Sequence, residues 1–92
     1  MRTLKAYWDE RPETREHIES WYTITKAASW KNPNDIKAQF RNASVLKNGR
    51  VVFNIKGNDH RLIVKIHYNT GIVFIRFIDT HKAYNQINAE EV

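Results

Sequence analysis

The chain has 92 residues, no cysteine and a formal net charge of +5 at neutral pH. This length is typical of one domain, residues 1–92, and a chain without cysteine has no disulfides and no thiolate metal ligands. The longest apolar runs, "LIV" and "IVFI", are far shorter than the roughly 20 residues that cross a bilayer. The N-terminus has charges where a signal peptide needs an apolar core. We therefore expect a cytoplasmic domain without a membrane segment.

The positive charge indicates a polyanionic partner, either nucleic acid or an acidic protein. The alternative is that a charge of +5 serves only to keep a small domain in solution. Composition does not separate the two interpretations.

Residues 1–41 are predicted to be mainly helical. Leu4, Tyr7 and Trp8 share one helical face, in a segment that ends before Pro12. A second helix is expected to begin at Pro12, because proline fits the first turn of a helix. Its apolar stripe consists of Ile18, Trp21, Tyr22, Thr25 and Ala28.

A short third helix is predicted where Asn32 can act as N-cap and Pro33 as the first helical residue. Ile36 and Phe40, four positions apart, form its apolar side. We expect the three tryptophans, Trp8, Trp21 and Trp30, to pack in the core and not to stack on bases.

From about residue 44 to residue 80 the pattern changes to three β-strands, "RVVFNI", "HRLIVKIHY" and "GIVFIRFID". They are separated by "KGND" and "YNTG", which are typical hairpin turns. Symmetric closure of both turns predicts an antiparallel meander with one apolar face that carries the helices. The expected apolar pairs are Phe53–Leu62, Val51–Val64, Leu62–Phe77, Val64–Ile75 and Ile66–Val73. The predicted fold class is α+β, with helices packed on one face of a small antiparallel sheet.

The opposite face of this sheet is predicted to be basic. The register places Arg50 beside Lys65, Asn54 beside Arg61, Ile63 beside Arg76, and Phe74 opposite Lys65. Like charges in directly opposite positions destabilise a sheet, and a bound phosphate would offset that repulsion. The alternative is that the long side chains extend into water, with Asp59 and Asp79 as neighbours that neutralise them.

The exit of the last strand carries Thr80, His81, Lys82 and Tyr84 in place of ordinary turn residues. Residues 81–92 are predicted to form a C-terminal helical turn and tail. If a turn of helix follows Thr80, His81 and Tyr84 share one side of it. The alternative is that Thr80 caps the turn, His81 is a surface residue, and Tyr84 packs its ring on the sheet edge.

The remaining histidines show no metal-ligand spacing, and we expect all of them to be solvated: His17, His60 and His67. No glycine-rich phosphate loop, serine nucleophile motif or metal-ligand cluster is present in the sequence.

The segment Trp30–Ile87 strongly resembles the HigB toxins of bacterial type II toxin–antitoxin pairs, which belong to the RelE-like messenger-RNA endonucleases. The most specific blocks are "WKNPNDIKAQF", "GRVVFNIKGNDHRLIV" and "IRFIDTHKAY". The upstream "TLKAYWDERPETREHIESWY" looks like the N-terminal helices of that family. Relatives usually begin with an additional edge strand, so we expect either a sheet that lacks this strand or a shortened version of the protein.

The resemblance implies a RelE-like fold and metal-independent cleavage of messenger RNA on the ribosome, without a cofactor. The reaction would be attack of the RNA 2′-hydroxyl on the adjacent phosphate. Arginine suits phosphate binding and histidine suits proton transfer near neutral pH. The implied catalytic residues are Arg61, Arg76, His81 and Tyr84. The expected RNA contacts are Arg50, Asn54, Lys56, Lys65 and Lys82.

The implied partners are messenger RNA, the ribosome and a cognate HigA-like helix-turn-helix antitoxin. Two other functions stay open from the sequence. One is a non-catalytic RNA- or ribosome-binding domain, and the other is an interaction protein whose basic face binds an acidic partner.

Overall fold

The computed structural model describes residues 2–92, which form an α+β fold with a four-stranded antiparallel sheet of order β1-β2-β3-β4. The N-terminal half contains α1 (Arg2–Glu10), the 3-10 helix η1 (Pro12–Thr14), α2 (Arg15–Ala27) and α3 (Pro33–Gln39). The rest contains β1 (Ser44–Val45), the 3-10 helix η2 (Lys47–Gly49), β2 (Arg50–Ile55), β3 (His60–His67), β4 (Ile72–Thr80) and α4 (His81–Tyr84). The predicted α+β fold class, with N-terminal helices, an antiparallel sheet and a short C-terminal helical turn, is confirmed.

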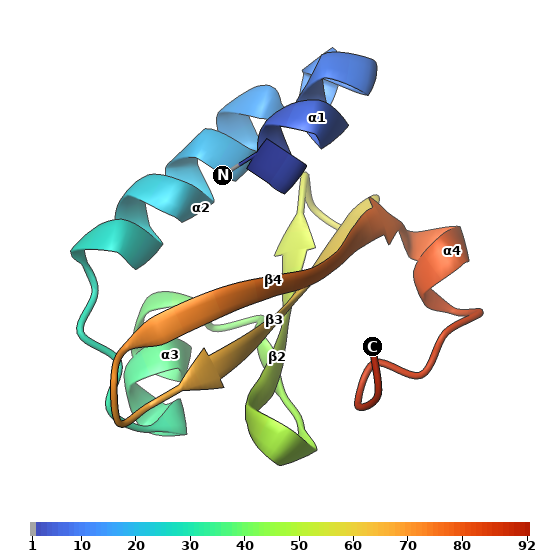
Figure 1. The fold of residues 1–92 in the computed structure, drawn as a ribbon. Coiled ribbons are helices and arrows are strands. Elements are labelled where there is room, and N and C mark those ends of the chain that lie inside the picture. The colour runs from blue at the N-terminus through green and yellow to red at the C-terminus, as the bar shows by residue number, and fades with distance from the viewer. Residues whose placement is uncertain (1) are drawn as a thin grey trace.

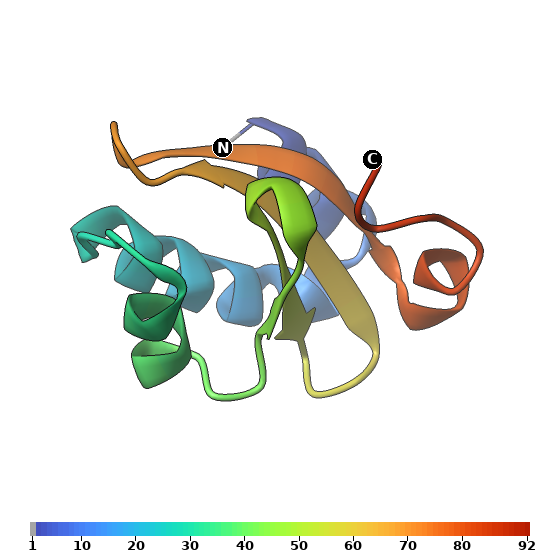
Figure 2. The same ribbon diagram turned by 90° about the horizontal axis from the view of Figure 1, so that it is seen from below.

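The helices α2 and α3 lie on one side of the strongly twisted sheet, and α1 lies beside α2 near β4 (Figures 1 and 2). The segment that contains α4 and the C-terminus lies at the other end of the sheet, away from α2 and α3 (Figure 2).

The helix α3 begins as the sequence predicted. The Asn32 side chain accepts a hydrogen bond from the amide of Asp35, and Pro33 is the first residue of the helix.

The core lies between the helices and the apolar face of the sheet. Ile18, Ile36, Leu62 and Val64 are fully buried there. The three tryptophans are also buried, which confirms their predicted packing role: Trp8, Trp21 and Trp30 are 8%, 4% and 6% exposed. Trp30 stacks on Phe53 with ring centroids 6.1 Å apart, so the aromatic residues of the helical half and of the sheet form one cluster.

The β2–β3 register is as predicted, with Val51 opposite Val64 and Phe53 opposite Leu62. The β3–β4 register holds at Val64–Ile75 and is then shifted by a β-bulge between Ile63 and Val64. Three corrections to the sequence prediction follow from these strands.

The expected Leu62–Phe77 and Ile63–Arg76 pairs are wrong, because Leu62 pairs with Ile78 and Ile63 pairs with Phe77. Arg76 is the additional residue that the bulge inserts into β4, and it has no partner on β3. The sheet also has a fourth strand, β1, which the sequence analysis did not include.

The second face of the sheet is the one turned away from the helices. The C-terminal tail covers part of this face. The Arg50 side chain donates hydrogen bonds from Nε and Nη2 to the main-chain oxygen of Val92, at 3.2 and 2.8 Å. This contact holds the end of the tail against the first residue of β2.

Candidate active site

The helix α4 begins directly at the end of β4 and carries two of the predicted catalytic side chains. The Thr80 hydroxyl oxygen accepts a hydrogen bond from the amide of Ala83 at 3.2 Å, so Thr80 is the N-cap. His81 and Tyr84 lie on the same side of this single turn, with ring centroids 6.4 Å apart. Both side chains are partly exposed, so they are accessible from solvent.

Arg61 joins this pair from β3. Its guanidinium lies over the Tyr84 ring, with Cζ 5.7 Å from the ring centroid. The same guanidinium donates hydrogen bonds to the main-chain oxygens of Asn58 and His60 and to Oδ1 of Asn58, at 3.1, 3.2 and 2.9 Å. Arg61 is only 8% exposed. Its orientation is therefore fixed by the β2–β3 turn and not free to follow a ligand.

The β2–β3 turn, residues 56–59, supports α4 as well. The amide of His81 donates a hydrogen bond to the main-chain oxygen of Asp59 at 2.9 Å. Lys56, a predicted RNA contact, has a positive φ of 53° in this turn and lies 3.9 Å from the Asp59 carboxylate. One turn thus positions Arg61 through Asn58 and His81 through Asp59.

Arg76 does not join this cluster. It lies at the bulge, exposed, three residues before Asp79, the residue of β4 that pairs with Arg61. At about 3.3 Å per residue this is a separation of roughly 10 Å along the strand. The face that was predicted to be basic therefore carries these two arginines at separate positions. Arg61 is buried and hydrogen-bonded, and Arg76 is exposed.

Three of the predicted RNA contacts, Arg50, Asn54 and Lys65, lie on the second face of the sheet, whereas Lys56 lies in the β2–β3 turn and Lys82 on α4. Arg50 pairs with Lys65 and Asn54 with Arg61, as predicted from the turns. Asn54 and Lys82 are exposed and Lys65 is half-buried. Arg50 differs from the others, because its guanidinium is occupied by the main-chain oxygen of Val92.

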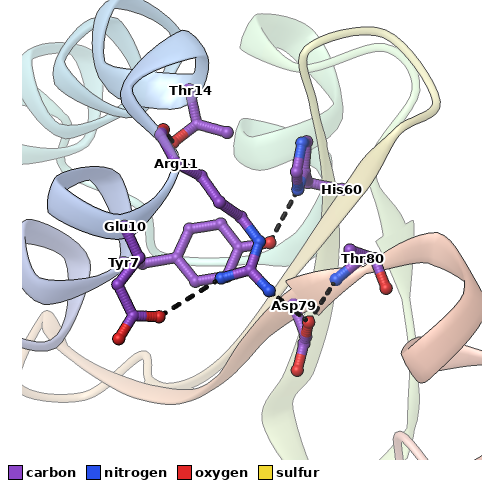
Figure 3. Close-up of polar contacts among 7 residues, drawn as sticks. All are labelled: Tyr7, Glu10, Arg11, Thr14, His60, Asp79 and Thr80. Carbon is purple, nitrogen blue, oxygen red and sulfur yellow. Dashed lines mark hydrogen bonds and ion pairs between the residues drawn. The ribbon is translucent and has the colours of Figure 1, made fainter.

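A second polar cluster, which the sequence analysis missed, lies on the helix side of the same strand ends (Figure 3). The Tyr7 hydroxyl from α1 is 2.6 Å from Nδ1 of His60. The two residues are 7% and 5% exposed. The prediction that His60 is solvated is wrong, whereas His17 and His67 are exposed as expected.

The alternation of side chains along β3 was the sequence signal that could have predicted the burial of His60. Arg61 and Leu62 face opposite sides of β3, so His60 has to face the helices together with Leu62. Burial raises the pKa of Tyr7 to about 12. Burial also lowers the pKa of His60, since it disfavours the charged imidazolium.

Arg11 connects this cluster to β4. Its guanidinium lies over the Tyr7 ring at 4.6 Å from the centroid and is 3.8 Å from the Asp79 carboxylate (Figure 3). The Asp79 Oδ1 accepts a hydrogen bond from the amide of Thr80 at 2.7 Å. Asp79 is therefore the partner of Arg11 and not of Arg76. The residue that follows α1 thus contacts the end of the strand from which α4 begins.

The cluster of Arg61, His81 and Tyr84 combines a fixed cation, an imidazole and a phenol at one end of a basic sheet face. These groups can bind a phosphate, transfer a proton and position a hydroxyl group. Within residues 2–92, no three histidine or carboxylate side chains are grouped so that they could hold a metal ion. In the same part of the chain, no helix combines the length and apolar character that crossing a membrane requires.

Comparison with known protein families identifies the family of the chain. A family model described as HigB_toxin, the RelE-like toxic component of a toxin–antitoxin system, matches residues 14–87. The chain belongs to the HigB toxin family. Comparison with curated proteins gives no match.

The match to the HigB family extends from η1 to the residues just after α4, so it includes Arg61, Arg76, His81 and Tyr84. It confirms the resemblance that the sequence blocks indicated. A family of toxic components also implies an antitoxin as partner. Tyr7 and Arg11 lie outside the matched residues, although both contact the strands that carry the site.

Proposed function

We propose that this toxin is a metal-independent endoribonuclease that cleaves messenger RNA on the ribosome, in the cytoplasm. The observation that carries the proposal is the contact of Arg61 with Tyr84, with His81 on the same helical turn, in a chain of the HigB family. In this reaction the RNA 2′-hydroxyl attacks the adjacent phosphate, and the 5′-oxygen of the next nucleotide leaves. The products are a cyclic phosphate and a free 5′-hydroxyl.

The geometry suggests a division of roles between the two arginines. Arg61 is held by three hydrogen bonds, so it would present its charge in a fixed position where negative charge develops on the phosphate. Arg76 is exposed at the bulge and would bind the RNA backbone before the reaction, together with Lys65 and Lys82. Asn54 and Lys56 are further proposed RNA contacts. The Arg50 guanidinium is bonded to the main-chain oxygen of Val92, so it would have to leave that oxygen to bind RNA.

His81 is the proposed proton-transfer residue. Its imidazole is partly exposed at the end of the basic face, and an imidazole can both accept and donate a proton through its ring nitrogens. Tyr84 would position the reacting hydroxyl or donate a proton. The cap by Thr80 and the bond to Asp59 fix the turn on which both groups lie.

A non-catalytic RNA-binding domain is the second candidate, and one observation favours it. The guanidinium of Arg61 already donates three hydrogen bonds to protein atoms, which leaves fewer N–H groups for a phosphate than a free arginine has. The basic second face would bind RNA whether the protein is an endoribonuclease or a non-catalytic domain.

The deciding experiment is primer extension on a translated message with purified ribosomes and the purified toxin. Defined cleavage sites that depend on both the toxin and the ribosomes would support the endonuclease, and ribosome binding without any cleavage would support the binding domain. Induced expression should also arrest growth, and co-expression of a HigA-like antitoxin should restore it. Normal growth at a high level of folded protein would contradict the toxin activity.

A further inference from the structure

One aromatic side chain of the sheet is exposed to solvent. Phe74 on β4 is 42% exposed, whereas every other phenylalanine, tyrosine and tryptophan in residues 2–92 is buried or half-buried. The tryptophans are therefore not available to a ligand, but the Phe74 ring is. A large aromatic ring that stays exposed on a regular sheet is suited to contact with a partner.

The Phe74 ring lies on the second face of the sheet. Exposed and half-buried residues alternate along β4, so Phe74 and Arg76 lie on one side of the strand and Val73 and Ile75 on the other. Val73 and Ile75 line a hollow together with Trp21 of α2, which shows that their side is the helix side. Phe74 therefore shares its face with the predicted RNA contacts of the sheet.

Two cations flank the ring. Lys65 of β3 pairs directly with Phe74 across the sheet, and Arg76 follows two residues further along β4. Neither cation forms an ion pair with another side chain of residues 2–92. An exposed ring between two such cations matches a nucleotide, because a nucleotide presents a flat aromatic base and a negatively charged phosphate.

Other occupants fit this patch less well. A symmetric contact between two copies of the chain would bring the Lys65 and Arg76 side chains of both copies close together, and like charges repel. An apolar protein surface would cover Phe74, but it would also bury the two cations without partners, which is costly. A nucleotide gives each group a partner, since its base stacks on the ring while its phosphate stays beside the cations.

The patch continues the candidate active site along the same face. Lys65 is four residues from Arg61 on β3, a separation of about 13 Å at 3.3 Å per residue. Arg76 lies between Phe74 and Asp79, the residue of β4 that pairs with Arg61. A strand of RNA that passes from Phe74 over the two cations therefore reaches Arg61 and the turn that carries His81.

We propose that Phe74 is a stacking platform for one base of single-stranded RNA, away from the cleaved bond, and that Lys65 and Arg76 bind the phosphate of that nucleotide. The inference rests on the proposed function, because the strand that passes here is the message to be cleaved. Every base has an aromatic face, so the platform adds affinity without selecting a sequence.

The test uses a short single-stranded 2′-O-methyl RNA, which cannot be cleaved because it lacks the attacking hydroxyl. Fluorescence anisotropy measures its binding to the folded toxin at several salt concentrations. Phe74→Leu keeps an apolar side chain and removes the ring, so affinity should fall roughly fivefold to a hundredfold. The slope of log affinity against log salt should stay unchanged, since no phosphate contact is lost. Phe74→Trp, which restores a ring, should recover the affinity.

A matched oligonucleotide whose sugars carry no bases separates stacking from phosphate binding. Wild type and Phe74→Leu should bind this abasic strand equally well, because it has nothing to stack on the ring. Tyr22→Leu is the control variant, since it removes a half-buried ring from α2 on the helix side. It should bind both oligonucleotides as the wild type does.

Three results would overturn the inference. They are equal affinity of wild type and Phe74→Leu for the strand with bases, an equal loss by Phe74→Leu on both strands, and no binding of the wild type at low salt. Polyglutamate that binds as tightly as RNA of the same charge, and loses as much affinity in Phe74→Leu, would instead assign the patch to an acidic protein and also overturn it.

The binding assay and the cleavage assay can fail separately. A toxin that stacks the base on Phe74 but never cuts a message on the ribosome contradicts the proposed function and leaves the platform in place. A toxin that cuts the message, while Phe74→Leu binds the oligonucleotide as well as the wild type, contradicts only the platform.

Discussion

The Tyr7 hydroxyl and Nδ1 of His60 form a buried hydrogen bond of 2.6 Å between residues that are 53 positions apart. It joins α1 to the first residue of β3, and His60 pairs across the sheet with Thr80, the N-cap of α4. The bond therefore involves the residue of β3 that pairs with the start of the turn that carries His81 and Tyr84.

Tyr7→Phe should lower the free energy of unfolding by about 1–3 kcal/mol, because His60 is then left buried without its partner. Chemical denaturation of both proteins measures the change. Tyr22→Phe is the matched control, since Tyr22 is only half-buried and should lose much less. Equal losses in the two variants would mean that the buried bond adds nothing to stability.

The lowered pKa of His60 makes stability depend on pH in a defined direction. The unfolded chain binds a proton at His60 near pH 6.5, whereas the folded chain resists protonation, so the unfolded state gains protons first as pH falls. Stability from this group is therefore complete above pH 6.5 and is lost as pH falls towards the folded-state pKa. His60→Gln should flatten the change in denaturation midpoint between pH 7.5 and 5, whereas His17→Gln, at an exposed position, should leave it unchanged.

Val64→Asp should prevent folding. Val64 is fully buried between Val51 and Ile75, and an unpaired carboxylate there costs several kcal/mol. Circular dichroism and thermal melting give the readout. Asn54→Asp, at an exposed position on the other face of β2, is the control and should melt near the wild type; a Val64→Asp protein that did the same would show the register to be wrong.

The two arginines should respond differently to replacement. Arg61→Ala removes three hydrogen bonds from a buried guanidinium, so stability should fall by about 2 kcal/mol or more. Arg76→Ala should change stability by no more than about 0.5 kcal/mol, because the side chain is exposed at the bulge. It should nevertheless weaken RNA binding and reduce the salt dependence of that binding, as loss of one phosphate contact does. Denaturation and binding titrations at two salt concentrations test both statements.

The arrangement of elements was predictable because the local signals agree with the fold. Helical spacing placed Leu4, Tyr7 and Trp8 on a buried face, and the hairpin turns set the β2–β3 register. The bulge at Arg76 was not predictable, since nothing in "FIRFID" breaks the strand pattern. The two residues of β1 are too few to show any periodicity.

Of the candidate site, the sequence indicated the residue types and the helical turn, but not their contacts. The proximity of Arg61 to Tyr84 depends on how α4 lies against the β2–β3 turn, and that is set by the bond between His81 and Asp59. The link from Tyr7 and Arg11 to the strand ends arises only from tertiary packing. No local pattern encodes a contact between residues so far apart in the chain.

His81→Ala separates the enzyme from the binding domain. The side chain is partly exposed and its main-chain bond to Asp59 remains in the variant, so folding and ribosome association should be nearly unchanged. Cleavage should fall by roughly 10²–10⁴, the usual contribution of a general acid–base group. Primer extension on a translated message, together with a ribosome-binding measurement for each protein, gives both quantities.

His67→Ala is the control for this experiment, because His67 is exposed near the other end of the same sheet face. Tyr84→Phe completes the series: it keeps the ring under the Arg61 guanidinium and removes only the hydroxyl. A loss in Tyr84→Phe as large as that in His81→Ala would assign proton transfer to both groups, whereas a loss in Tyr84→Phe alone would transfer the role to the phenol. If His81→Ala cleaves as well as the wild type, His81 is a surface residue of a capped turn, and its imidazole has no part in the reaction.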